Sequence, residues 1–139
     1  MKSLRNAVLT ATLTVLLVSC HKGFVYRIFN NSGEDIILWS YDTKMNATEY
    51  VIKSGRAEDV ANPCRLSVKQ VTSGREWVYD PVPLSKEYWY SRSSFGKTDV
   101  RFQLEPDGGI FVLAPGTQAI VSKFVAQPTG FPLRPRKVN

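Results

Sequence analysis

The side chains best suited to nucleophilic or metal chemistry in this sequence are two thiols, Cys20 and Cys64, and one imidazole, His21. A serine or cysteine hydrolase needs a histidine base beside its nucleophile, and a zinc site needs several nitrogen or sulfur ligands. A single histidine near the start of the chain does not supply them, and no glycine-rich phosphate loop is present. We therefore expect no metal and no cofactor.

Carboxylates are the remaining candidates for acid–base or calcium chemistry. Glu105 and Asp107 lie next to glycines in the run EPDGG. A calcium loop requires more oxygen ligands at fixed spacing, whereas Asp-Gly is a strong signal for a hairpin turn. The adjacent acidic pairs at 34–35 and 58–59 would point to opposite faces of a strand, which suits solvated edges. None of these carboxylates predicts a catalytic pair.

The residues before Cys20 indicate what its thiol is for. Lys2 and Arg5 give the chain a positive start, and residues 7–18 carry no charge. This run is too short to cross a bilayer, which takes about 20 helical residues. Together with the small residue before Cys20, it is typical of a secretory signal peptide. A cytoplasmic N-terminal helix is a poor alternative, because the run has no polar face.

The end of that run, Leu17-Val18-Ser19-Cys20, resembles the lipobox of bacterial lipoproteins. The resemblance implies cleavage before Cys20, a diacylglycerol thioether on its sulfur and, as is common in the family, an acylated amine. A thiolate is the nucleophile that such a thioether requires. One acyl chain anchors a protein only marginally, whereas two or more hold it stably on a membrane. An ordinary cleaved signal with an accidental cysteine is the alternative.

His21 bears on the membrane in which such a lipoprotein would reside. In enterobacterial lipoproteins, aspartate after the lipidated cysteine favours retention in the inner membrane, and here the residue is histidine. We therefore expect a lipid anchor in the outer membrane, facing the periplasm. The inner membrane and the cell surface stay open as alternatives.

Length and charge limit the number of domains and the kinds of partner that the mature protein can have. Removing residues 1–19 leaves about 120 residues, the size of one compact domain. The precursor has 18 basic and 12 acidic residues and a net charge of +6; losing Lys2 and Arg5 lowers it to about +4. Apart from the basic end of the chain at 134–137, this charge is dispersed, whereas nucleic-acid-binding proteins concentrate it. We expect no nucleic-acid partner; anionic envelope surfaces or an acidic protein patch are favoured, and simple solubility is the alternative.

Cys64 has no partner for an intramolecular disulfide once Cys20 is lipidated. In an oxidising compartment a lone cysteine is either buried or used in an intermolecular bond. Free cysteine is among the most buried residue types. We expect Cys64 to be buried and inert.

Short strands separated by turn residues account for most of the mature chain. Alternating, β-branched or aromatic runs predict strands at 24–29, 36–41, 50–52, 65–71, 76–79, 100–105, 110–113 and 119–125, with a short return strand near Val60. The first two strands are expected to form a hairpin across Asn30–Gly33. The clearest hairpin joins the strands on either side of Pro106–Gly109. No long run has helical spacing without a breaker.

These patterns predict an all-β protein, a small antiparallel β-sandwich, with a small β-barrel as the alternative. The expected division is a removed signal peptide at 1–19, a lipidated N-terminus and tether at 20–23, the sandwich domain at 24–126 and a C-terminal tail at 127–139. Prolines 128, 132 and 135 exclude a central strand in that tail. We expect it to cross the surface or to hang free.

Four residues form the candidate binding site: Tyr88, Trp89, Tyr90 and Arg92. Three consecutive aromatic residues cannot all face one core from one strand, so at least one should point outward. Tyr, Trp and Arg dominate interface hot spots. A strand buried on both sides, or a loop capping the sandwich, is the alternative.

Two other aromatic pairs have the spacing of residues on a single strand face. They are Trp39 with Tyr41 and Trp77 with Tyr79. Core packing is the simpler interpretation of both pairs.

The function expected from these observations is that of a non-enzymatic, membrane-anchored module that binds a protein partner in the cell envelope. Assembly factors, secretion-system lipoproteins, enzyme inhibitors and immunity proteins are of this kind, and the expectation rests on analogy at the level of the fold. Binding of peptidoglycan or another carbohydrate through Tyr88, Trp89 and Tyr90 is the alternative. A hydrolase using Asp80 or Glu87 is a residual one.

Overall fold

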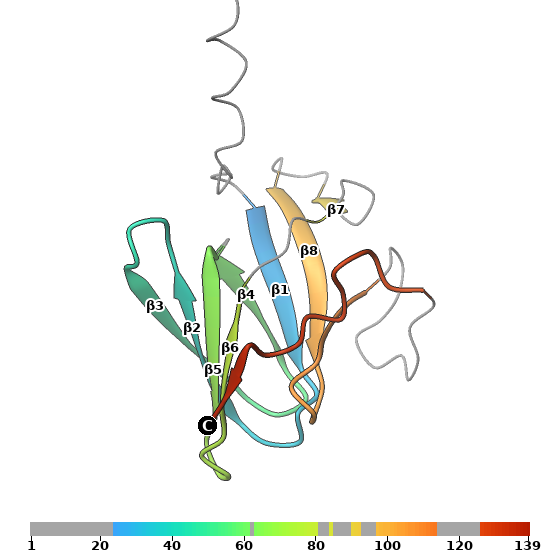
Figure 1. The fold of residues 1–139 in the computed structure, drawn as a ribbon. Helices are drawn as coiled ribbons and strands as arrows, with labels where there is room; N and C mark the ends of the chain where they lie inside the picture. Colours follow the sequence, from blue (N-terminus) through green and yellow to red (C-terminus); the bar gives the residue numbers. More distant parts are fainter. Residues whose placement is uncertain (1–23, 62, 81–83, 85–89, 93–96, 114–125) are drawn as a thin grey trace, which may run out of the picture.

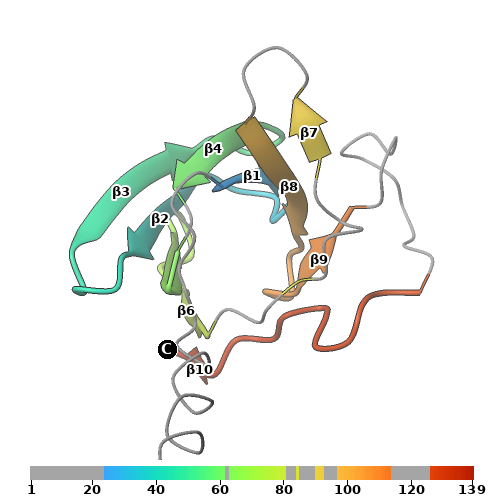
Figure 2. The same cartoon turned by 90° about the horizontal axis from the view of Figure 1, so that it is seen from above.

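The structure, a computed structural model, describes residues 24–61, 63–80, 84, 90–92, 97–113 and 126–139. Over these residues the chain forms two five-stranded sheets that face each other and do not close into a barrel. Figures 1 and 2 show the sheets from the side and from above. The expected all-β sandwich is confirmed.

The first sheet, sheet A, has the order β4-β1-β8-β7, with β9 also paired to β8. Its strands are β1 (Phe24–Asn30), β4 (Ala57–Ala61), β7 (Tyr90–Arg92), β8 (Lys97–Leu104) and β9 (Ile110–Val112). The first part of β8 pairs with β7 and the last part with β9. Because β8 takes two short neighbours on one side, it is the longest strand of the sheet.

The second sheet, sheet B, has the order β10-β6-β5-β2-β3, and all its neighbours are antiparallel. Its strands are β2 (Ile36–Tyr41), β3 (Ala47–Ile52), β5 (Arg65–Gln70), β6 (Glu76–Tyr79) and β10 (Lys137–Val138). In β2 and β5 buried residues alternate with partly exposed ones. This alternation is the pattern of strands with one face in a core.

The prediction of a hairpin between the first two strands is wrong, because β1 and β2 belong to different sheets. β1 pairs antiparallel with β4 and parallel with β8, the one parallel pair among the described strands. Between β1 and β2 the chain crosses from sheet A to sheet B. Asn30, which is fully buried, stabilises this crossing. Its Nδ2 donates to the carbonyls of Glu34 at 2.8 Å and Ile52 at 2.9 Å, and its Oδ1 accepts from the backbone N–H of Ser32. This side chain gives hydrogen-bond partners to backbone groups that the change of sheet leaves outside the strand ladders.

The hairpin expected across Pro106–Gly109 is confirmed, because β8 pairs with β9. The strands predicted at 65–71 and 76–79 correspond to β5 and β6, which also pair with each other. The turn between β8 and β9 contains Gly108 at φ +80°, a conformation that favours glycine. The strand expected at 119–125 lies outside the described residues.

The core fills the space between the sheets and includes both members of one predicted aromatic pair, Trp77 and Tyr79. The Tyr79 hydroxyl donates to the carbonyl of Gly108 at 2.8 Å, which links sheet B to the β8–β9 turn of sheet A. The other buried members of the core are Ile28, Ile36, Leu38, Ile52, Val60, Leu66, Val68, Val100, Phe102, Leu104, Ile110, Val112 and Leu133.

The C-terminal segment, residues 126–139, crosses the opening between β9 and β6, as Figure 2 shows. Gln127 bonds through its side chain to both backbone groups of Val112, at 2.9 and 3.0 Å. Leu133 and Ile110 exchange two backbone hydrogen bonds, and β10 then pairs with β6. Of the two courses left open for residues 127–139, the structure shows a segment that crosses the surface and joins both sheets.

Candidate functional site

Two of the four residues predicted to bind a partner fall outside the described part of the chain. Tyr88 and Trp89 lie outside it. Tyr90 and Arg92 are the first and last residues of β7, where their backbones pair with Asp99 and Lys97 of β8. Cys20, the predicted lipidation site, also lies outside the described residues.

Trp39 and Tyr41 do not occupy the core, so the interpretation of this pair as core packing is wrong. In β2 the buried positions are Ile36, Leu38 and Ser40, and the alternate residues are only partly buried. The reason is the phase of the strand: the residues next to each aromatic face sheet A, which turns the aromatic side chains outward. The spacing of two residues identified a common face but not which face.

The outward residues of β2 form the middle of a surface on sheet B that we call the outer face. Directly paired residues share a face, and the register places Trp39 between Glu49 of β3 and Ser67 of β5. The neighbouring rows are Val51–Ile37–Lys69 and Ala47–Tyr41–Arg65. Val51 is 54% exposed. The outer face therefore surrounds an indole ring with apolar and charged groups.

Trp39 is held in place at the centre of the outer face. Its indole N–H donates to Oε2 of Glu49 at 3.0 Å, across the β2–β3 pair. The hydrogen bond restrains the ring without burying it, so less side-chain entropy remains to be lost when a partner contacts it. Sequence reasoning missed this residue because no local signal states which side of β2 faces the core.

The charges around the outer face are of both signs. Lys69 lies 3.2 Å from Glu76, and Arg65 lies 3.9 Å from Asp80, each pair being partly exposed. Exposed ion pairs of this kind contribute little to stability. They leave no strong field of either sign on this surface.

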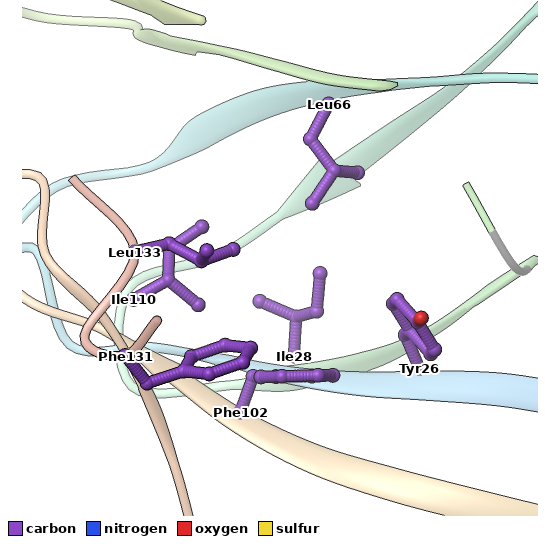
Figure 3. Close-up of a pocket in the computed structure, with 7 residues that line it drawn as sticks. All are labelled: Tyr26, Ile28, Leu66, Phe102, Ile110, Phe131 and Leu133. Atoms are coloured by element: carbon purple, nitrogen blue, oxygen red, sulfur yellow. The ribbon is translucent and has the colours of Figure 1, made fainter. Parts of the chain in front are cut away.

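One cavity lined by described residues offers little room and an almost entirely apolar wall. Seven residues line it, drawn in Figure 3: Tyr26, Ile28, Leu66, Phe102, Ile110, Phe131 and Leu133. The cavity has a volume of about 10 Å³, which is barely enough for one water molecule. Phe131 of the C-terminal segment stacks on Phe102, with ring centroids 6.0 Å apart, and so fills one side of it. We therefore place the candidate site on the outer face.

Cys64 does not have the free, buried thiol expected from the sequence: it is partly exposed and disulfide-bonded. Its backbone N–H donates to the carbonyl of Tyr41 at 2.8 Å, and Ala61, three residues earlier, pairs with Val25. Cys64 is thus near the start of β1. The other cysteine in the sequence is Cys20, and a sulfur held in a thioether cannot also form a disulfide.

Two partly exposed carboxylates, those of Glu34 and Asp35, accept hydrogen bonds from neighbouring turns. Glu34 accepts from the backbone N–H of Ser73 and Thr72, and these bonds lower its pKa. The ammonium of Lys53, at 2.7 Å, lowers the pKa of Asp35. Among the described residues no cluster of three or more His, Cys, Asp or Glu side chains could hold a metal ion.

No protein-family model, curated protein sequence or solved structure shows significant similarity to this chain. In the part of the chain that the structure describes, no helix has the length and apolar character needed to cross a bilayer.

Proposed function

We propose that this protein is a lipid-anchored module of the bacterial cell envelope that binds a protein partner through the outer face of sheet B. The observation that carries the proposal is Trp39, restrained by Glu49 yet partly exposed at the centre of a sheet face. The lipid anchor rests on the lipobox-like residues 17–20 alone. It requires the sulfur of Cys20 to carry the lipid in place of a disulfide with Cys64.

The composition of the outer face favours a protein as the partner. Trp, Tyr and Arg are the residue types that carry most binding energy at protein interfaces, and Trp39, Tyr41 and Arg65 occupy adjacent positions on β2 and β5. A surface with apolar residues at its centre and ion pairs at its rim matches the anatomy of such interfaces. The mixed charges of Lys69, Glu76 and Arg65 do not suit a strongly anionic polymer.

A carbohydrate ligand is the second candidate, and one observation favours it. Trp39 offers an aromatic face for stacking, and the carboxylate of Glu49 at its edge is an acceptor for hydroxyl groups. Such a ligand would use the same central residue as the protein partner, so one substitution tests both.

Replacement of Trp39 by Ala provides that test. We expect detergent-solubilised envelopes to yield one protein in stoichiometric amount with the wild type and with Val71→Ala, an exposed control in the β5–β6 turn, but not with Trp39→Ala. Trp89→Ala, tested alongside, reports on the site predicted from the sequence. Equal recovery with wild type and Trp39→Ala would overturn the proposal. Quenching of tryptophan fluorescence by soluble peptidoglycan fragments, lost in Trp39→Ala, would support the carbohydrate instead.

The lipid anchor has its own test. Cys20→Ser should abolish incorporation of labelled fatty acid, whereas Cys64→Ser, the matched control, should retain it. The intact mass of the wild-type protein from membranes should show the mature chain plus acyl groups. The mass of an unacylated chain lacking two hydrogen atoms would instead show both cysteines in one disulfide and overturn the anchor.

A further inference from the structure

The turn between β2 and β3 exposes the side chain of Met45 at the end of the sandwich where β1 begins. Figure 1 shows this turn and the start of β1 at the same end. A chain of contacts links them: Val25 pairs with Ala61, whose carbonyl accepts from Ser40 Oγ at 3.1 Å. Ser40 lies next to Tyr41, the last residue of β2 before the turn.

The tether to the predicted anchor is too short to let this end move far from a membrane. Only four residue steps separate Cys20 from Phe24, the first residue of β1. Fully extended, they span about 14 Å. A lipid on Cys20 would therefore hold the start of β1 close to the lipid headgroups, and the β2–β3 turn lies at this end of the domain.

The β2–β3 turn is built to present Met45 rigidly. Met45 is 54% exposed and has a φ of +64°, the one positive φ of a non-glycine residue among the described residues. The backbone is fixed by the carboxylate of Asp42, whose Oδ1 accepts from the backbone N–H groups of Lys44 at 2.8 Å and Asn46 at 2.9 Å. The turn thus exposes an apolar side chain next to the exposed ammonium group of Lys44.

The charges at this end also suit a membrane surface. Two guanidinium groups, those of Arg65 and Arg136, share the single carboxylate of Asp80, at 3.9 and 3.1 Å. Among the residues that the structure describes, these three side chains together carry one net positive charge. Anionic headgroups attract such cations near the surface by about 1 kcal/mol per charge.

We propose that the β2–β3 turn is a membrane contact, with Met45 inserted among the lipid headgroups and Lys44 bound to lipid phosphate. This inference rests on the proposed lipid anchor at Cys20. It orients the domain on its membrane and leaves the outer face of sheet B pointing sideways, accessible to a partner.

Depth-dependent quenching tests this contact in the full lipidated protein. An environment-sensitive fluorophore is attached at Met45→Cys or, as the control at the opposite end, at Thr72→Cys, both in a Cys64→Ser background. The protein is reconstituted into vesicles of phosphatidylethanolamine and phosphatidylglycerol and isolated by flotation. We expect the label at 45 to be quenched several-fold more by spin-labelled lipid than by aqueous iodide, and the label at 72 to show the reverse.

Each outcome of this experiment supports or overturns the membrane contact or the lipid anchor. Co-flotation with both labels open to iodide and insensitive to spin-labelled lipid would overturn the membrane contact and leave the anchor standing. Failure of the protein to float would overturn the anchor and with it the contact. A second variant, Lys44→Glu, should reduce lipid quenching at 45 if phosphate binding holds the turn; unchanged quenching would remove Lys44 from the contact.

Discussion

The hydroxyl of Tyr79 donates a hydrogen bond of 2.8 Å to the carbonyl of Gly108, deep between the two sheets. Tyr79 belongs to β6 of sheet B, and Gly108 to the turn that joins β8 and β9 of sheet A. The same glycine lies against the indole ring of Trp77: a Cβ added to it would meet Cε2 at 2.8 Å. Two aromatic residues of one strand therefore fix the turn of the facing sheet.

Gly108→Ala should be strongly destabilising. The added methyl group would overlap Trp77, and φ +80° is strained for any residue with a Cβ. Together these effects should lower the free energy of unfolding by about 2–4 kcal/mol. Gly74→Ala is the matched control, because Gly74 has φ +70° but open space around it, and should cost only about 1 kcal/mol. Equal losses in urea denaturation would show that the Trp77 contact is unimportant.

Tyr79 should make the protein sensitive to alkali. Burial, with a smaller effect of the Asp107 charge, raises the pKa of Tyr79 far above its usual value. The unfolded state would release this proton near a pH of about 10 while the native state keeps it. Stability is thus fully present below that pH and falls as pH rises above it. Tyr79→Phe should lose about 1–2 kcal/mol at neutral pH but show a shallower alkaline decline in thermal melts; an unchanged slope contradicts the assignment.

Asn30 should be the least replaceable polar residue at the crossing between the sheets. Its amide donates to two carbonyls and accepts from Ser32, and the residue is fully buried. Asn30→Ala leaves several buried backbone groups without partners and should cost about 3 kcal/mol. Asn31→Ala, next to it but exposed, should cost less than about 1 kcal/mol. Similar denaturation midpoints for the two variants would argue against the crossing as a structural clamp.

The C-terminal segment should behave as part of the domain. Leu133 is 7% exposed and packs in the core, whereas Val138, in β10, is 58% exposed. Leu133→Ala should lower the free energy of unfolding by about 2–4 kcal/mol, and Val138→Ala by less than about 1 kcal/mol. Hydrogen exchange at the Ile110 amide, which bonds to the Leu133 carbonyl at 3.0 Å, should accelerate in the first variant only. Slow exchange in both would mean that the segment contributes little to the closure.

Acid should weaken the attachment of the C-terminal segment at the ion pair between Asp107 and Arg134. The backbone N–H of Gly109, followed by the Arg134 side chain, lowers the pKa of Asp107. A lowered pKa contributes stability above the unfolded value of about 4, and that stability is lost as pH falls through the native pKa. Asp107→Asn should therefore make hydrogen exchange at the Leu133 amide faster at neutral pH and less dependent on pH below about 4. An unaltered pH profile would show that the Arg134 contact does not hold the segment.

Local patterns in the sequence were enough to predict the class of fold and most strands. Alternation in residues 65–71 and 100–105, and the turn residues Pro106–Gly109, correspond to β5, β8 and the β8–β9 turn. These features depend on neighbours along the chain, since a strand with one buried face must alternate and a tight turn needs glycine. Trp77 and Tyr79 were also predicted correctly as core residues.

The tertiary structure decided which strands pair and which side of each strand faces the core. Nothing local distinguishes a hairpin between residues 24–29 and 36–41 from the observed crossing, which depends on Asn30 meeting Ile52 from another sheet. The outward direction of Trp39 likewise follows from which side of β2 meets sheet A, and a shift of one residue would have reversed it. The sequence alone determined most strands and turns, and it alone shows the lipobox-like residues 17–20, because these features depend on adjacent residues. Only the packing of two sheets decided which aromatic side chains are buried and which remain available to a partner.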